Sequence, residues 1–78
     1  MKTIRQVKVK WTDSIHGAGW NDHRAASTSR PTKITTVGYL LERDKDRVVV
    51  AQSVSDDTEE LGNLITIPRA AVTSIKRL

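Results

Sequence analysis

Apolar and polar residues alternate in several short segments, and this alternation is the main signal of local structure. Within residues 4–12, the apolar residues Val7, Val9 and Trp11 alternate with Gln and Lys. A period of two is typical of a strand that buries one face and exposes the other. The intervening lysines therefore predict a first strand with a basic outer face.

Four further segments have the composition of strands, being rich in β-branched and other apolar residues. They are residues 34–44, 47–55, 64–68 and 71–77. Charged residues between the first two predict a hairpin turn, and the acidic and polar residues 56–63 predict a loop or the end of a hairpin. Pro68 should end its strand because proline cannot donate to a central ladder. Only residues 22–26 and 56–61 favour a helix, so the chain is predicted to be all-β.

Residues 13–33 lose the period of two and contain Gly17, Gly19 and Pro31, so they predict a long loop. Loops longer than about 12–15 residues in a small domain are usually functional or disordered. Trp20 could stack on a base, with His23 and Arg24 close to its phosphate. The alternative is that Trp20 packs onto the sheet, in a core that contains no phenylalanine.

The same loop offers conceivable metal ligands at Asp13, His16, Asp22 and His23. Two histidines in a loop are more often exposed to solvent, so no metal site is predicted. Gly17 and Gly19 do not form a dinucleotide-binding motif, because the third glycine and the βαβ unit are missing.

Length and composition limit what the chain can be. Seventy-eight residues allow one domain, and the absence of cysteine excludes disulfides and zinc–cysteine sites. No cysteine nucleophile exists and no serine lies in a G-x-S-x-G motif, so we expect a protein that is not an enzyme and needs no cofactor. Domains this small often gain buried surface by forming oligomers, which favours a homo-oligomer.

Charge is distributed unevenly around the net value of +4. Residues 1–33 contain seven basic and two acidic residues, a net charge of +5, whereas residues 48–78 contain three basic and four acidic residues, a net charge of −1. A positive region favours an anionic partner such as RNA or a nucleotide. The alternative is a surface charge that serves only solubility.

Three segments together resemble the Sm/LSm/Hfq family of small, strongly bent five-stranded barrels. Residues 7–13 (VKVKWTD) are similar to its opening strand. Residues 38–44 (GYLLERD), followed by the apolar residues 48–50, are similar to the first Sm motif, in which a glycine permits a bend and an aspartate hydrogen-bonds the turn. Residues 67–75 (IPRAAVTSI) are similar to the second Sm motif in its Hfq form.

The resemblance implies one SH3-like or Sm-like barrel over residues 1–78, with a long first hairpin loop at about 13–33. The chain departs from the family in lacking its N-terminal helix. Ala70 stands in place of the Hfq histidine, and Pro68 and Arg69 replace an Arg-Gly pair. The fold can survive these changes, whereas the family's base-binding pocket is put in doubt.

In Sm-like rings two turns line a central pore that holds single-stranded RNA. By position, the resemblance gives this role to Lys45, Arg47 and Arg69. The alternative is that these residues belong to an ordinary charged hairpin that binds no RNA. The strand before the second motif's turn pairs with the last strand of the next subunit in such rings. This implies an oligomer interface made by Leu64, Ile65, Ile67, Val72 and Ile75.

We therefore expect a non-catalytic, ring-forming binding protein that resembles small proteins of bacteriophages and acts in the cytoplasm of the host cell. Its expected ligand is single-stranded RNA or another anion, and no membrane contact is expected. One alternative is a sponge that sequesters a small nucleotide signal between subunits. Another is a structural or protein-interaction module.

Overall fold

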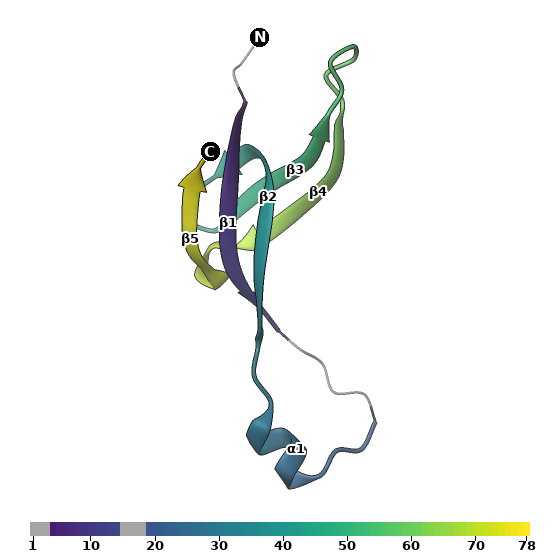
Figure 1. Cartoon of the computed structure of the whole chain (residues 1–78), viewed down its shortest axis with the longest axis vertical. Coiled ribbons are helices and arrows are strands. Elements are labelled where there is room, and N and C mark those ends of the chain that lie inside the picture. The colour runs from purple at the N-terminus through teal and green to yellow at the C-terminus, as the bar shows by residue number, and fades with distance from the viewer. Residues whose placement is uncertain (1–3, 15–18) are drawn as a thin grey trace.

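The computed structural model describes residues 4–14 and 19–78, which form five antiparallel strands, one short α-helix and a 3-10 turn (Figure 1). The predicted all-β fold with five strands is confirmed. In chain order the elements are β1 (Arg5–Asp13), α1 (His23–Thr28), β2 (Thr32–Arg43), β3 (Arg47–Val54), β4 (Leu61–Pro68), η1 (Arg69–Ala71) and β5 (Val72–Arg77).

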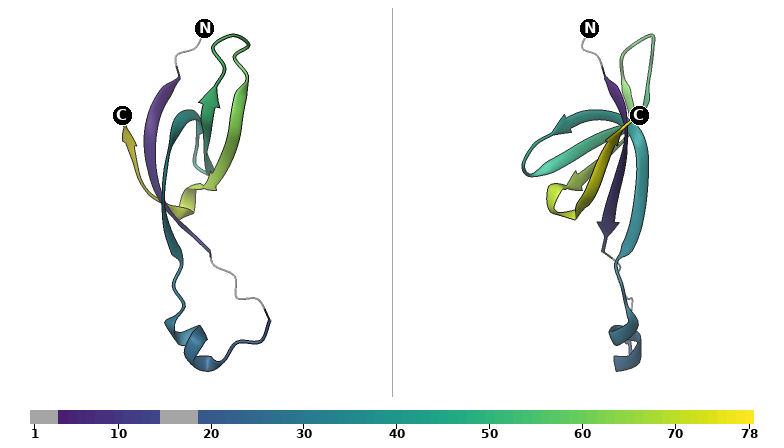
Figure 2. Two further views of the ribbon diagram at one scale, coloured as in Figure 1. Left: turned by 45° about the vertical axis from the view of Figure 1, so that its right-hand side comes forward. Right: turned by 60° about the vertical axis from the view of Figure 1, so that its left-hand side comes forward.

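All five strands belong to one sheet in the order β4-β3-β2-β1-β5. The sheet does not close into a barrel. β4 and β5 are joined through η1, but no ladder pairs them within the described chain, so the sheet stays open and both strands are edges. Figure 2 shows how strongly this open sheet curves.

Gly38 lies where β2 crosses closely over β3. A Cβ atom at this position would lie 2.5 Å from the carbonyl oxygen of Ala51 and 2.6 Å from a methyl of Val50. Such distances are too short for any side chain, so only glycine allows the two strands this approach. A register shift between Leu40 and Glu42 follows, and bulges of this kind increase the local twist.

The concave side of the sheet holds the core. Val7, Val9 and Trp11 of β1 meet Val48 and Val50 of β3 there, as the period of two predicts. Ile67 of β4 completes the cluster and has no exposed surface. The indole nitrogen of Trp11 donates a hydrogen bond to the Thr36 hydroxyl at 3.0 Å, so its polar atom is satisfied.

The pairing of β1 with β2 ends at Asp13 and Thr32, and residues 19–31 project from one end of the molecule (Figure 1). The long loop expected at about 13–33 contains the short helix α1, which overlaps residues 22–26, one of the two segments whose sequence favours a helix. Asp22 caps this helix, its carboxylate accepting from the amide of Ala25 at 2.7 Å. We call residues 19–31 the arm. The molecule as a whole measures 54 × 22 × 20 Å along its principal axes.

Candidate functional site

The two turns to which the resemblance gives RNA binding lie side by side. The amide of Arg69 donates to the carbonyl of Asp46 at 2.9 Å, and Arg47 is the ladder partner of Pro68. Lys45 lies in the same β2–β3 turn. We call Lys45, Arg47 and Arg69, with the turn between them, the rim.

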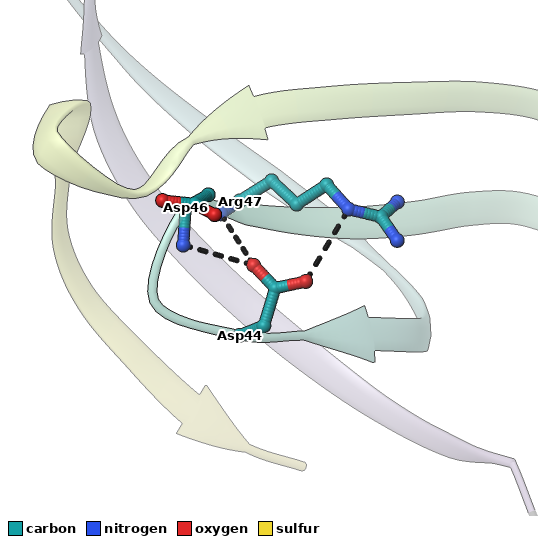
Figure 3. Close-up of polar contacts among 3 residues, drawn as sticks. All are labelled: Asp44, Asp46 and Arg47. Atoms are coloured by element: carbon teal, nitrogen blue, oxygen red, sulfur yellow. Dashed lines mark hydrogen bonds and ion pairs between the residues drawn. The ribbon is translucent and has the colours of Figure 1, made fainter.

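Asp44 organises this rim (Figure 3). One of its carboxylate oxygens accepts from the amides of Asp46 and Arg47, both at 2.9 Å, and the other lies 3.4 Å from Nε of Arg47. The two backbone hydrogen bonds are the main reason why the pKa of Asp44 lies below its ordinary value, with the charge of Arg47 adding to the effect. Arg47 therefore has an anionic partner already.

The rim is a mixed electrostatic site. Its three basic residues share the turn with Asp44 and Asp46, which leaves a local net charge of +1. Arg69 is half-buried, and its Nη1 atom is buried without a hydrogen-bond partner. Because that atom is shielded from solvent, an anion at the rim would meet the exposed basic side chains together with two nearby carboxylates.

A second basic surface lies on the convex face of β5, β1 and β2. Lys8 and Lys10 alternate with the buried residues of β1 and so point away from the core. The sheet register places Lys76 opposite Lys8, and Lys33 opposite Thr12. We call Lys8, Lys10, Lys33 and Lys76 the lysine face.

The outward positions around these lysines are uncharged. Lys10 has Thr35 on one side and Ser74 on the other, and Lys8 has Val37 on the side away from Lys76. In the described parts of β1, β2 and β5, no acidic side chain occupies this face between Gln6 and Thr12 or at the positions paired with them. The lysine face therefore has a local charge of +4, unlike the rim.

Two features suit the lysine face to an anion. Lys8 and Lys76 are direct cross-strand partners, and like charges so placed repel each other unless an anion lies between them. A groove of about 410 Å³ adjoins the face and is lined by Lys10, Lys33 and residues that include Thr12, Thr35 and Thr73. The hydroxyl of Thr73 is held by the carbonyl of Lys10 at 2.9 Å.

The loop candidates Trp20, His23 and Arg24 all lie on the arm. All three are exposed, and Trp20 is fully so. Trp20 does not pack onto the sheet, so the alternative that it fills the core is wrong. The arm projects beyond the end of the β1–β2 hairpin at which Lys33 of the lysine face is paired with Thr12.

The residues expected at an oligomer interface differ in how much they expose. Leu64 on β4 is 58% exposed, whereas Ile65, Val72 and Ile75 are half-buried against the core. Ile67 is wholly buried, so its side chain is not available to a partner strand. The two strands that carry them are the free edges of the sheet.

A metal site has no support in the part of the chain that the structure describes. Across residues 4–14 and 19–78, no three His, Asp or Glu side chains gather closely enough to hold a metal ion. His16, one of the conceivable ligands, lies outside the described residues.

The helices in the described part of the chain are too short to cross a membrane. Comparison with protein families, curated proteins and solved structures finds no match.

Sequence reasoning found only half of the lysine face. The alternation in residues 4–12 identified a basic strand face, but Lys33 precedes the predicted second strand and Lys76 lies 66 positions after Lys10. Only the register shows that they share one surface. A sequence signal did exist for Lys33, because Thr32, Ile34 and Thr36 continue the alternation backward to this residue.

Proposed function

We propose that this protein is a non-catalytic binding protein for single-stranded RNA, and that the lysine face holds the RNA phosphates. The observation on which this rests is the grouping of four lysines, without an acidic neighbour, on three adjacent strands. Lysine ammonium groups on flexible stems bind phosphate as point charges, without reading sequence. The resemblance to Sm-like proteins favours single-stranded RNA over other polyanions.

The rim has a secondary role in this proposal. Lys45 and Arg69 add positive charge at the rim, while Arg47 is partly neutralised by Asp44. Removing a rim charge should therefore weaken binding less than removing a lysine of the lysine face.

Assembly into a ring is part of the same proposal. The free edges of β4 and β5 present unpaired backbone groups, and pairing them between subunits would satisfy those groups. Each contact of this kind is head-to-tail, so the subunits must close into a ring to avoid forming a filament. A ring in the cytoplasm of a phage-infected cell would repeat the lysine face once per subunit.

Binding of a fluorescent oligouridine, followed by anisotropy over a range of salt concentrations, tests the function. Each phosphate neutralised should contribute about −0.7 to the slope of log affinity against log salt. The variant Lys10→Gln/Lys33→Gln should bind about tenfold or more weakly with a shallower slope, because two phosphate contacts are lost. The rim variant Lys45→Gln removes one charge and is compared with the single variant Lys10→Gln, which should lose more affinity.

Equal affinity and slope for the wild type and the Lys10→Gln/Lys33→Gln variant would overturn the role of the lysine face. Circular dichroism of each variant shows whether the sheet is intact, and these exposed substitutions should leave it so.

The groove beside Lys10 and Lys33 favours a second candidate function, the sequestration of a small nucleotide. A nucleotide sponge predicts saturable binding of about one ligand per subunit and a rise in melting temperature with ligand concentration. A panel of mono- and cyclic nucleotides in a thermal-shift assay distinguishes it from RNA binding. If neither nucleotides nor RNA bind, the structural or protein-interaction module remains.

A further inference from the structure

The two ends of the molecule differ in charge. The β3–β4 connection carries Asp56, Asp57, Glu59 and Glu60, all exposed, and we call these four residues the acidic tip. Residues 55–60 contain no basic residue. The one ion pair found within the described chain joins Arg47 to Asp44, so the acidic tip has no cationic partner of its own there.

The arm at the other end has the complementary character. Arg24 and Arg30 are exposed, and the single acidic residue of the arm, Asp22, is already used as the cap of α1. The hydrogen bonds formed by its side chains are local, such as that from Arg30 to the carbonyl of Ser29 at 2.8 Å. The arm therefore presents two cations toward solvent.

The apolar surface of the arm is also without a partner. Trp20 is fully exposed, and none of residues 19–31 is buried, so the arm contributes nothing to the core. An exposed tryptophan next to arginines has the composition of an interface centre. The arm thus has the character of a docking element rather than of a stabilising one.

A groove for the Trp20 side chain lies beside the acidic tip. A groove of about 310 Å³ is lined by residues that include Val54, Glu60, Leu61 and Gly62. Leu61 is 40% exposed there. An aromatic ring in the groove would have aliphatic contacts, with carboxylates at its edge for the neighbouring arginines.

Arm and acidic tip cannot meet within one chain. They lie at opposite ends of the longest axis, which measures 54 Å (Figures 1 and 2). We propose that they meet between chains: the arm of one copy docks on the acidic tip of a second copy, with Trp20 in the groove at Leu61 and with Arg24 and Arg30 facing the carboxylates. This contact is independent of RNA binding and of the pairing of β4 with β5.

Matched variants at the two ends test the proposal. The arm variant carries Trp20→Ala, Arg24→Gln and Arg30→Gln; the tip variant carries Asp56→Asn, Asp57→Asn and Glu60→Gln. In sedimentation velocity, wild-type association should rise with concentration and weaken at high salt, because exposed charges are screened. Each variant alone should associate at least tenfold more weakly.

Mixing the two variants provides the sharpest readout. One partner retains an intact arm and the other an intact tip, so a mixture should recover one contact with wild-type affinity. The control variant Lys45→Gln should associate as the wild type does. Quenching of Trp20 fluorescence by acrylamide should fall on association, while buried Trp11 is little affected.

Three results would overturn the proposal: a wild type that shows no salt-sensitive association beyond its edge-paired state, variants that associate as the wild type does, or a mixture that recovers nothing. Loss of RNA affinity in the arm variant with unchanged self-association would instead assign the arm to RNA.

Discussion

β1 and β2 build two regions with opposite properties. Inside the sheet they place Val7, Val9 and Trp11 in the core, whereas past Asp13 and Thr32 the same hairpin continues into an arm without a buried side chain. Hydrophobic burial is the main stabilising term in folding. Stability should therefore depend on the sheet, and changes in the arm should affect binding alone.

The largest expected effect is the difference in unfolding free energy between alanine substitutions at Ile67 and at Trp20. Ile67→Ala removes a side chain with no exposed surface and should lower the free energy of unfolding by about 2–5 kcal/mol. Trp20→Ala removes a much larger but exposed side chain and should change it by less than about 0.5 kcal/mol. Urea denaturation of both variants gives the two values. A large loss of unfolding free energy in Trp20→Ala would show that the arm packs on the domain.

A pair of glycines sharpens the comparison within the sheet. Gly38→Ala would force a methyl against the backbone of Ala51 and should destabilise by about 1–3 kcal/mol. At Gly62 an added methyl would have Cβ of Ser53 as its nearest neighbour, at 3.5 Å, so Gly62→Ala should be neutral or stabilise by about 0.4–1 kcal/mol. Similar melting temperatures for both variants would contradict the tight crossing of β2 over β3.

The sequence predicted the strands where burial decides the conformation. The segment 47–55 corresponds to β3 at Arg47–Val54, because four consecutive residues, Val48 to Ala51, are buried. The start of β4 was missed: Gly62 and Asn63 are typical turn residues, yet the ladder runs on to pair Ser53 with Gly62. Asn63 adopts a left-handed φ of 55° within the strand, which asparagine tolerates better than most residues.

The candidate sites were harder to predict than the strands, because they depend on register and on the third dimension. The resemblance predicted that residues 44–47 and Arg69 share one rim, and the amide of Arg69 donates to the carbonyl of Asp46. The lysine face needed the pairing of Lys8 with Lys76, which no local pattern shows. The open sheet was not predicted. Residues 22–26 were seen to favour a helix, but the extent of α1 could not be predicted, since six helical residues without a buried face leave no hydrophobic period.

The smallest expected effect concerns Asp44, whose carboxylate fixes the β2–β3 turn through the amides of Asp46 and Arg47. The pKa of Asp44 is lowered in the folded state, so its contribution to stability is present above the pKa of the unfolded chain and is lost as the pH falls through the folded value. Asp44→Asn should therefore remove part of the loss of stability on acidification, while being less stable than the wild type at neutral pH.

Asp46→Asn is the matched control, because the Asp46 side chain accepts none of the hydrogen bonds that hold this turn. Urea denaturation at several pH values should give the wild type and the control similar slopes of stability against pH in the acidic range, and a shallower slope for Asp44→Asn. Identical slopes for all three proteins would mean that the turn is held by the ladders of β2 and β3 alone, and that the sheet needs no side-chain support at this end.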